Sequence, residues 1–210
     1  MKLIIFGATG GTGKLLVEQA LTAGNQVIVY VRNPNKLNIK SERLTIIEGE
    51  LANKEKIESA LKGVDAVLSV LGPRGGSKGK PLTQGMQNII TGMKKQSVRR
   101  LIVTSTLSTK DHQDIPEFRV KVLVTLVRIL MHAAYEEIVS MANIVRVSDL
   151  DWTIVRLAML NNKPKSGKVR AGYLGKSEVG LWISRADIAD FMLKQVQDTK
   201  YFQKAPVISN

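Results

Sequence analysis

Apolar runs of strand length recur along the chain and are separated by segments of helical length. The runs are Leu3–Phe6, Gln26–Val31, Leu44–Glu48, Ala66–Leu71, Leu101–Thr104 and Trp152–Arg156. They lack the polar alternation of half-exposed strands, as expected where helices cover both faces of a sheet. Strands that alternate with helices in this way indicate parallel pairing through crossover connections.

The segments between these runs predict the helices. We expect helices at Gly11–Ala23, Lys54–Leu61, Gln84–Lys95, much of Pro116–Val147, and Arg185–Val196. Turn signals at Asn33-Pro34, Gly63 and Gly72-Pro73 fall at the joins. The pattern therefore predicts an α/β fold with a doubly wound parallel sheet and helices on both faces.

Nothing along the chain marks a domain boundary. There is no internal repeat or long linker, so residues 1–210 are predicted to form a single domain. The alternation weakens after Arg156, and ligand crevices of open α/β sheets are often walled by such late segments. We expect residues 108–134 and 157–180 to form a lid and a wall on the substrate side, with 108–134 alternatively a dimer surface.

Composition narrows the compartment and the chemistry. The chain has no cysteine, which excludes disulfides, thiolate zinc sites and a cysteine nucleophile, and a cytoplasmic location fits best. The N-terminal apolar run is too short for a secretory signal. The most apolar later stretch, Val120–Leu130, contains two cations and falls short of the roughly 20 residues that span a membrane. We expect no membrane span.

The formal net charge is +13, from 31 Lys and Arg against 18 Asp and Glu. Nucleic acid, an anionic membrane surface or a phosphate-rich ligand would each suit such a charge. The cations are spread along the chain, and no aromatic residues are interleaved as a base-stacking surface requires. A solubilising, ligand-steering surface is favoured over specific nucleic-acid binding.

A glycine-rich turn follows the first strand directly and precedes an amphipathic helix. In GATGGTG, Gly7, Gly10 and Gly13 have the three-residue spacing of the dinucleotide-binding turn, in a Rossmann-type setting. The glycines allow a tight turn, close approach of the pyrophosphate and close helix packing. Gly11 belongs to the same turn, and Thr9 and Thr12 add hydroxyl donors. The alternative is a merely structural turn.

The residue after the second strand indicates which dinucleotide is bound. NAD-binding units place an acidic residue there for the ribose 2′-hydroxyl, but this chain has Arg32, with Lys36 four positions on. Two cations suit the 2′-phosphate of NADP(H). An ordinary solvated arginine is the alternative. Further strand ends should complete the crevice: Glu50 and Leu51, Leu71, Gly72 and Arg74, and Thr104.

Five segments in order, namely GATGGTG, VYVRNPNKL, LTQGMQNIITGMKKQSVRRLIVTST, LDWTIVR and WISRADIADFMLKQV, resemble the atypical short-chain dehydrogenases/reductases of the NmrA-like type. Within them the chain most resembles the flavin reductase/biliverdin reductase B group. The resemblance implies a Rossmann-type sheet, NADPH, and hydride delivery to a flavin or another flat conjugated acceptor.

Two positions depart from related enzymes. Tyr135 is followed four positions on by Val139 rather than by lysine, so carbonyl reduction through a Tyr-x-x-x-Lys pair is disfavoured. Where the biliverdin-reducing relatives carry a histidine, the register places Met159, which we expect to contact substrate. Tetrapyrrole specificity is therefore not implied.

Candidate catalytic groups are few. Ser105 and Thr106 end the fifth strand and can orient the nicotinamide or the acceptor, or merely cap backbone groups. His112 can reach the acceptor as a general acid, or lie solvated in its loop. With two histidines in the chain we expect no metal site. The leading expectation is an NADPH-dependent oxidoreductase with a small-molecule acceptor; the alternative is an NADP-binding sensor without turnover. The sequence leaves a homodimer open.

Overall fold

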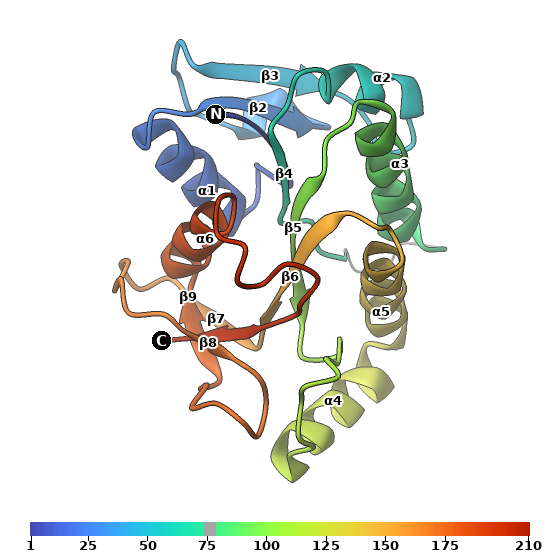
Figure 1. Ribbon diagram of the computed structural model, residues 1–210, viewed down its shortest axis with the longest axis vertical. Helices are drawn as coiled ribbons and strands as arrows, with labels where there is room; N and C mark the ends of the chain where they lie inside the picture. Colours follow the sequence, from blue (N-terminus) through green and yellow to red (C-terminus); the bar gives the residue numbers. More distant parts are fainter. Residues whose placement is uncertain (74–78) are drawn as a thin grey trace.

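The computed structural model describes residues 1–73 and 79–210. Within these residues an eight-stranded sheet runs through the molecule in the order β3-β2-β1-β4-β5-β6-β10-β8 (Figure 1). Its strands are β1 (Lys2–Phe6), β2 (Gln26–Val31), β3 (Leu44–Glu48), β4 (Ala66–Ser69), β5 (Arg100–Thr106), β6 (Asp151–Leu157), β8 (Arg170–Gly172) and β10 (Val207–Ser209). All neighbours are parallel except β8, which runs antiparallel to β10.

Helices cover both faces of this sheet, as Figure 1 shows. The helices are α1 (Gly11–Thr22), α2 (Lys54–Ala60), α3 (Pro81–Lys95), α4 (Phe118–Leu130), α5 (His132–Arg146) and α6 (Arg185–Lys194), with a 3-10 turn η1 at Pro34–Lys36. α1 packs on α6 on one side, and α2, α3 and α5 pack in a row on the other. The predicted α/β architecture, a Rossmann-like parallel sheet in a single domain, is confirmed.

The first strand shows why the runs lack polar alternation. Leu3 and Ile5 belong to the apolar core under α1 and α6, whereas Ile4 and Phe6 belong to the core under α2, α3 and α5. All four side chains are fully buried. A strand between two helical layers buries both of its faces, so each position is apolar.

The structure differs from the sequence-based prediction at several boundaries. α3 begins at Pro81 instead of Gln84, because proline suits the first helical position. The long predicted helix within 116–147 is two helices that meet at Met131, whose backbone is not helical. A further parallel pair joins β7 (Met159–Asn161), in the segment 157–180 expected to form a wall, with β9 (Trp182–Ser184), directly after that segment.

One carboxylate of α6, that of Asp187, binds the loop at residues 166–167. Ser184 caps α6 by accepting a hydrogen bond from the Asp187 N–H at 3.0 Å. The Asp187 carboxylate in turn accepts hydrogen bonds from the N–H groups of Ser166 and Gly167, both at 3.0 Å. The sequence motif ISRAD therefore builds a helix cap and a loop anchor.

Candidate functional site

The carboxyl ends of the strands open on a cleft where the strand order reverses. β1 lies between β2 and β4, and the chain leaves β1 on one side and returns on the other, which is where open α/β sheets bind ligands. The cleft has a volume of about 650 Å³. Its lining residues are Gly7, Thr9, Gly10, Val31, Arg32, Lys36, Glu50, Leu51, Ala52, Val70, Leu71, Gly72, Pro81, Leu82, Gln84, Gly85 and Glu137.

Two glycines of the first turn are required by its geometry. Gly7 has a φ of +84°, and a Cβ there would lie 2.9 Å from the backbone of Val70, directly after β4. A Cβ on Gly13 would collide with the carbonyl oxygen of Gly7. The turn therefore brings the start of α1 against the end of β1.

The N-terminus of α1 is arranged for an anion. The first intrahelical hydrogen bond at this end is from the Lys14 N–H to the Gly10 oxygen, at 2.9 Å, so the preceding N–H groups have no intrahelical partner. No side chain caps this end, and no acidic residue lies in the first turn. Gly10 lines the cleft, and a Cβ there would meet only the Gly7 oxygen, at 3.4 Å. These features fit a pyrophosphate.

A residue that sequence reasoning missed lies beside this turn. A Cβ on Gly11 would approach the Arg185 side chain to 3.1 Å, so the guanidinium-bearing chain at the start of α6 packs against the start of α1. Its Nη1 donates to Asn162 Oδ1 at 2.6 Å. Gly11, Thr12 and Gly13 do not line the cleft themselves, in agreement with their place inside the helix end.

Arg32 and Lys36 meet at one end of the cleft. They share a recess of about 160 Å³ with Thr9, Asn33 and Glu50. Both cations are exposed, and among the described residues neither forms an ion pair. The recess thus holds two positive groups against one carboxylate, which is the charge balance that a phosphate requires.

Hydrogen bonds from Tyr30 and Asn88 fix the backbone of two residues that line the cleft, Glu50 and Leu51. Glu50 accepts a hydrogen bond through its backbone oxygen from the Tyr30 hydroxyl at 3.1 Å, and burial followed by the charge of Glu50 raises the pKa of Tyr30. The Leu51 oxygen accepts from the Asn88 amide at 2.8 Å. Leu71 and Gly72, predicted from the end of β4, also line the cleft. Arg74, predicted with them, lies outside the described residues.

Glu137 was not predicted from the sequence. It lies on α5 and is almost fully buried, and its Oε1 accepts from the Leu82 N–H, at 2.5 Å, in the first turn of α3. The carboxylate also lines the cleft. It therefore fixes the start of α3 at the cleft, a role that only the tertiary structure reveals.

A second, apolar cavity adjoins the cleft. This chamber has a volume of about 260 Å³ and is lined by Pro73, Thr106, Leu107, Ser108, Leu123, Val124, Val127, Met131, Ala134, Tyr135, Ile138, Leu157, Ala158 and Met159. Gly72 lines the cleft and the next residue, Pro73, lines the chamber; on α5, Glu137 lines the cleft and Ile138 the chamber. The two cavities are therefore neighbours along both segments.

Of the three residues predicted at the end of β5, only Thr106 lines a cavity. Thr106 reaches the chamber, where its hydroxyl oxygen accepts from the Ser108 N–H at 3.2 Å. Ser105 points elsewhere: it is buried, and its hydroxyl shares a 2.6 Å hydrogen bond with that of Thr109. Thr104 lines neither cavity and donates to the Ser69 oxygen at 3.5 Å.

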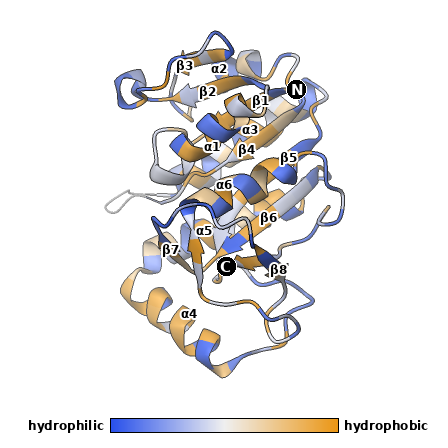
Figure 2. Cartoon of the chain, turned by 90° about the vertical axis from the view of Figure 1, so that its left-hand side faces the viewer, coloured by the Kyte–Doolittle hydropathy of each residue, from blue (hydrophilic) through white to orange (hydrophobic). Residues whose placement is uncertain are grey.

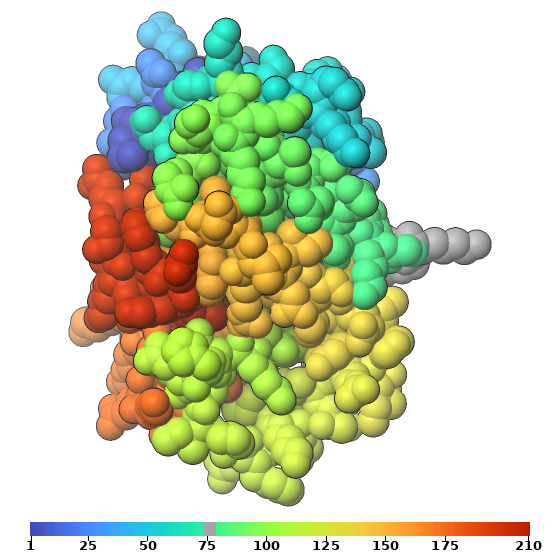
Figure 3. Space-filling model, turned by 45° about the vertical axis from the view of Figure 1, so that its right-hand side comes forward, coloured from blue at the N-terminus to red at the C-terminus, as the bar shows by residue number. Residues whose placement is uncertain are grey.

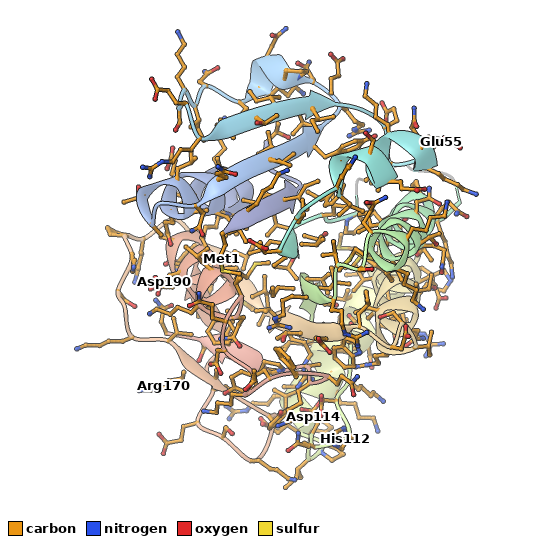
Figure 4. The ribbon with its side chains drawn as sticks, turned by 45° about the horizontal axis from the view of Figure 1, so that its top comes forward. Met1, Glu55, His112, Asp114, Arg170 and Asp190 are labelled. Carbon is orange, nitrogen blue, oxygen red and sulfur yellow. The ribbon has the colours of Figure 1, made fainter. Side chains whose placement is uncertain are left out.

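The structure places only one of the two predicted substrate contacts, Met159 and His112, at the chamber. Met159 on β7 lines the chamber, as expected. The His112 side chain is 80% exposed and lines neither cavity; its nearest charged neighbour is Asp111, at 3.3 Å from Nδ1. Figure 4 shows His112 beside Asp114 at the end of the molecule away from Glu55 of α2. The structure therefore does not bring His112 to the chamber.

Tyr135 is the titratable group of the chamber that sequence reasoning set aside. The Arg128 guanidinium lies 5.9 Å from the centre of its ring.

Among the described residues no cluster of His, Cys, Asp or Glu could hold a metal ion. In the same described ranges, no helix has the length and apolarity needed to cross a bilayer.

Two known proteins are similar to this chain in sequence. Isoflavone reductase homolog A622-like of Nicotiana tabacum is 27% identical over 214 residues, which cover 97% of this chain and 66% of that protein. Photosystem II assembly factor Ycf39 of Synechocystis is 27% identical over 128 residues, 58% of this chain and 38% of that protein. The chain thus spans less than two thirds of the length of both relatives.

Two solved structures share the fold at low sequence identity. A short-chain dehydrogenase/reductase from Veillonella parvula in complex with NADP has a TM-score of 0.78 at 22% identity, with 100% of this chain and 94% of that one covered. The anaerobillin reductase ChuY from Escherichia coli O157:H7 has a TM-score of 0.80 at 17% identity, covering 99% and 96%. At the level of sequence, the profile described as NAD(P)H-binding matches residues 7–199. The match takes in both the glycine turn and the β4 and β5 ends, and the chain belongs to the NAD(P)H-binding family.

Proposed function

We propose that this protein is an NADPH-dependent oxidoreductase that reduces a flat, conjugated small molecule, with a free flavin as the first choice. The observation that carries the proposal is the apolar chamber that adjoins the dinucleotide cleft along both Gly72-Pro73 and Glu137-Ile138. A ring in the chamber would lie next to the part of the cleft that Gly72 and Glu137 line. The flavin reductase/biliverdin reductase B group remains our choice of subgroup within the family.

NADPH rather than NADH is proposed because of the recess at the other end of the cleft. Arg32 and Lys36 face it together, without carboxylate partners among the described residues. A guanidinium and an ammonium bind a phosphate dianion more strongly than a neutral hydroxyl. Glu50, in the same recess, disfavours an anion, so the preference rests on two cations against one acid.

The chamber's size supports a single ring system. Small-molecule pockets typically measure roughly 300–1,000 Å³, and this chamber measures about 260 Å³. It is lined mostly by aliphatic side chains from α4, α5 and the segment after β6. The volume disfavours an extended tetrapyrrole and the aliphatic lining disfavours a sugar, so both favour a flat, largely apolar ring.

The side chains of the protein would act mainly by holding the nicotinamide and the acceptor in the orientation that hydride transfer needs. When bound, NADPH supplies the hydride, and the single proton that completes the reduction comes from water. Thr106 can hydrogen-bond the nicotinamide or the acceptor, since its hydroxyl proton is free to donate while its oxygen accepts from Ser108. Aliphatic side chains around it exclude water from the two rings. No acidic side chain lines the chamber, so we assign the rate to alignment.

A second candidate is a sensor that binds NADP(H) without turnover. It is favoured by the missing Tyr-x-x-x-Lys pair and by the engagement of the Ser105 hydroxyl with Thr109. Oxidation of NADPH in the presence of FMN, FAD, riboflavin, quinones or biliverdin separates the two. Turnover with a flavin supports the reductase; NADPH binding without turnover on any acceptor supports the sensor; efficient reduction of a simple aldehyde alone would refute the flat-acceptor proposal.

A further inference from the structure

α4 exposes an apolar face to solvent. Most of the large apolar side chains that are exposed in the described part of the chain fall between Ile115 and Met131. On α4 they are Phe118, Val122, Leu126, Ile129 and Leu130, and Phe118 and Leu130 are 80% and 79% exposed. Figure 2 shows this helix as an apolar rod at one end of the molecule, and Figure 3 shows that it forms that end of the surface.

The exposed residues are distinct from those that line the chamber. At about 100° per residue, Phe118, Val122, Leu126, Ile129 and Leu130 fall within an arc of roughly 120°. The half-buried residues Leu123, Val124 and Val127 lie outside this arc, beginning about 20° beyond Leu130, and line the chamber. One face of α4 thus has its partner in the protein, and the other has none among the described residues.

All the charged residues within α4 are cations. Arg119, Lys121 and Arg128 are exposed, and α4 contains no acidic residue. None of the three forms an ion pair among the described residues. On the same projection Arg119 falls inside the apolar arc, whereas Lys121 and Arg128 lie about 60–80° beyond its other border, with the Arg128 guanidinium over the Tyr135 ring. The net charge of the whole chain, +13, has the same sign.

This arrangement disfavours a second copy of the chain on the same face. Two α4 helices packed together through the arc would bring Arg119 of both copies into one interface and Lys121 of both near its edge, without a carboxylate within either helix to offset them. An anionic lipid surface satisfies both features, because headgroup phosphates pair with the cations while the apolar arc enters the boundary with the acyl chains.

We infer that α4 is an interfacial helix by which the protein docks on an anionic membrane surface, with Phe118, Leu126 and Ile129 inserted at the lipid boundary. The inference stands on the outer face of α4 and does not depend on the reductase activity. Docking is peripheral, since a 13-residue helix is too short to span a bilayer.

The test is co-sedimentation of the full chain with vesicles of phosphatidylcholine, with or without phosphatidylglycerol. We expect binding to the anionic vesicles only, weakening as salt screens the cations. Leu126→Glu should reduce the partition coefficient at least tenfold, since it places a carboxylate in the apolar arc. Val147→Glu is the matched control: Val147 is 82% exposed beyond the end of α5, and its replacement should leave binding unchanged.

NADPH binding by each variant shows that it is folded, since α4 does not contribute to the cleft. Failure to bind anionic vesicles, or equal binding of the wild type and Leu126→Glu, would overturn the inference. A dimer in sedimentation velocity that Leu126→Glu disrupts, without vesicle binding, would show that a second copy covers this face.

Discussion

Arg156 on β6 and Asp114, in the loop that follows β5, form a bidentate ion pair inside the protein, with N–O distances of 2.6 and 2.7 Å. The Arg156 side chain is fully buried, and its remaining groups donate to the backbone oxygens of Ala205 and Thr109. Asp114 also accepts from the Leu174 N–H at 3.1 Å. This pair joins β6, the loop after β5 and the segment of residues 157–180.

Replacement of Arg156 by leucine should destabilise the protein strongly. The Asp114 carboxylate would stay largely buried without its partner, and breaking a buried pair in this way typically costs about 3–5 kcal/mol. Arg99→Leu is the control, because its pair with Asp151 is exposed and screened by solvent and should contribute little to stability. Urea unfolding of both variants measures the difference; similar losses for the two would contradict the structural role of Arg156.

The same ion pair makes the free energy of unfolding depend on pH. Burial alone would raise the pKa of Asp114, but the hydrogen bonds from Arg156 and from backbone N–H groups hold that pKa below its ordinary value. A carboxyl whose pKa is lower in the folded state stabilises the protein above its unfolded pKa, about 3.9. That contribution is lost as the pH falls through the lower, folded value.

Asp114→Asn should therefore lower stability at neutral pH and flatten the fall in unfolding free energy below about pH 4. Some slope should remain, because the pKa values of Asp187 and Asp190 are also lowered by their hydrogen bonds against the effect of burial. Urea unfolding across this pH range measures it. An unchanged slope in Asp114→Asn would show that this carboxyl does not contribute.

The parts of the fold that sequence reasoning predicted are those with local signals. β1, β2, β4, β5 and β6 contribute apolar side chains to both cores, and the glycine turn carries its own spacing. The break at Met131 has no glycine or proline to mark it. Arg156 and Asp114 are 42 residues apart, and Glu137 and Tyr135 look like ordinary helix residues until α5 is packed beside α3 and α4. Such roles arise from tertiary contacts.

Arg32→Asp should reverse the preference for NADPH. The substitution replaces one of two cations in the recess with a second carboxylate beside Glu50, which repels the 2′-phosphate but can accept from a ribose hydroxyl. We expect NADPH affinity to fall at least tenfold and NADH affinity to hold or rise. Titration of both nucleotides into both proteins measures this, with Arg43→Asp, an exposed arginine that does not line the cleft, as control. Equal affinities for the two nucleotides in the wild type would refute the proposed preference.

Thr106 and Ser105 should behave differently although they are adjacent. Thr106→Val keeps the shape of the chamber and removes its hydroxyl, so kcat with a flavin should fall several-fold while the NADPH dissociation constant stays the same. Ser105→Ala breaks the buried bond to Thr109 and should lower the unfolding free energy by about 1 kcal/mol with little effect on kcat. The reverse assignment of the two effects would place the working hydroxyl on Ser105.

The central claim is that the acceptor occupies the chamber beside the cleft, and filling the chamber tests it most directly. Ala134→Trp places an indole among the lining residues of α5, while Thr125→Trp on the exposed side of α4 adds the same bulk elsewhere. The measurement is steady-state NADPH oxidation with FMN, together with the NADPH dissociation constant. We predict that Ala134→Trp lowers kcat/KM for FMN at least tenfold with NADPH binding intact and that Thr125→Trp changes neither; full FMN turnover by Ala134→Trp would contradict the account.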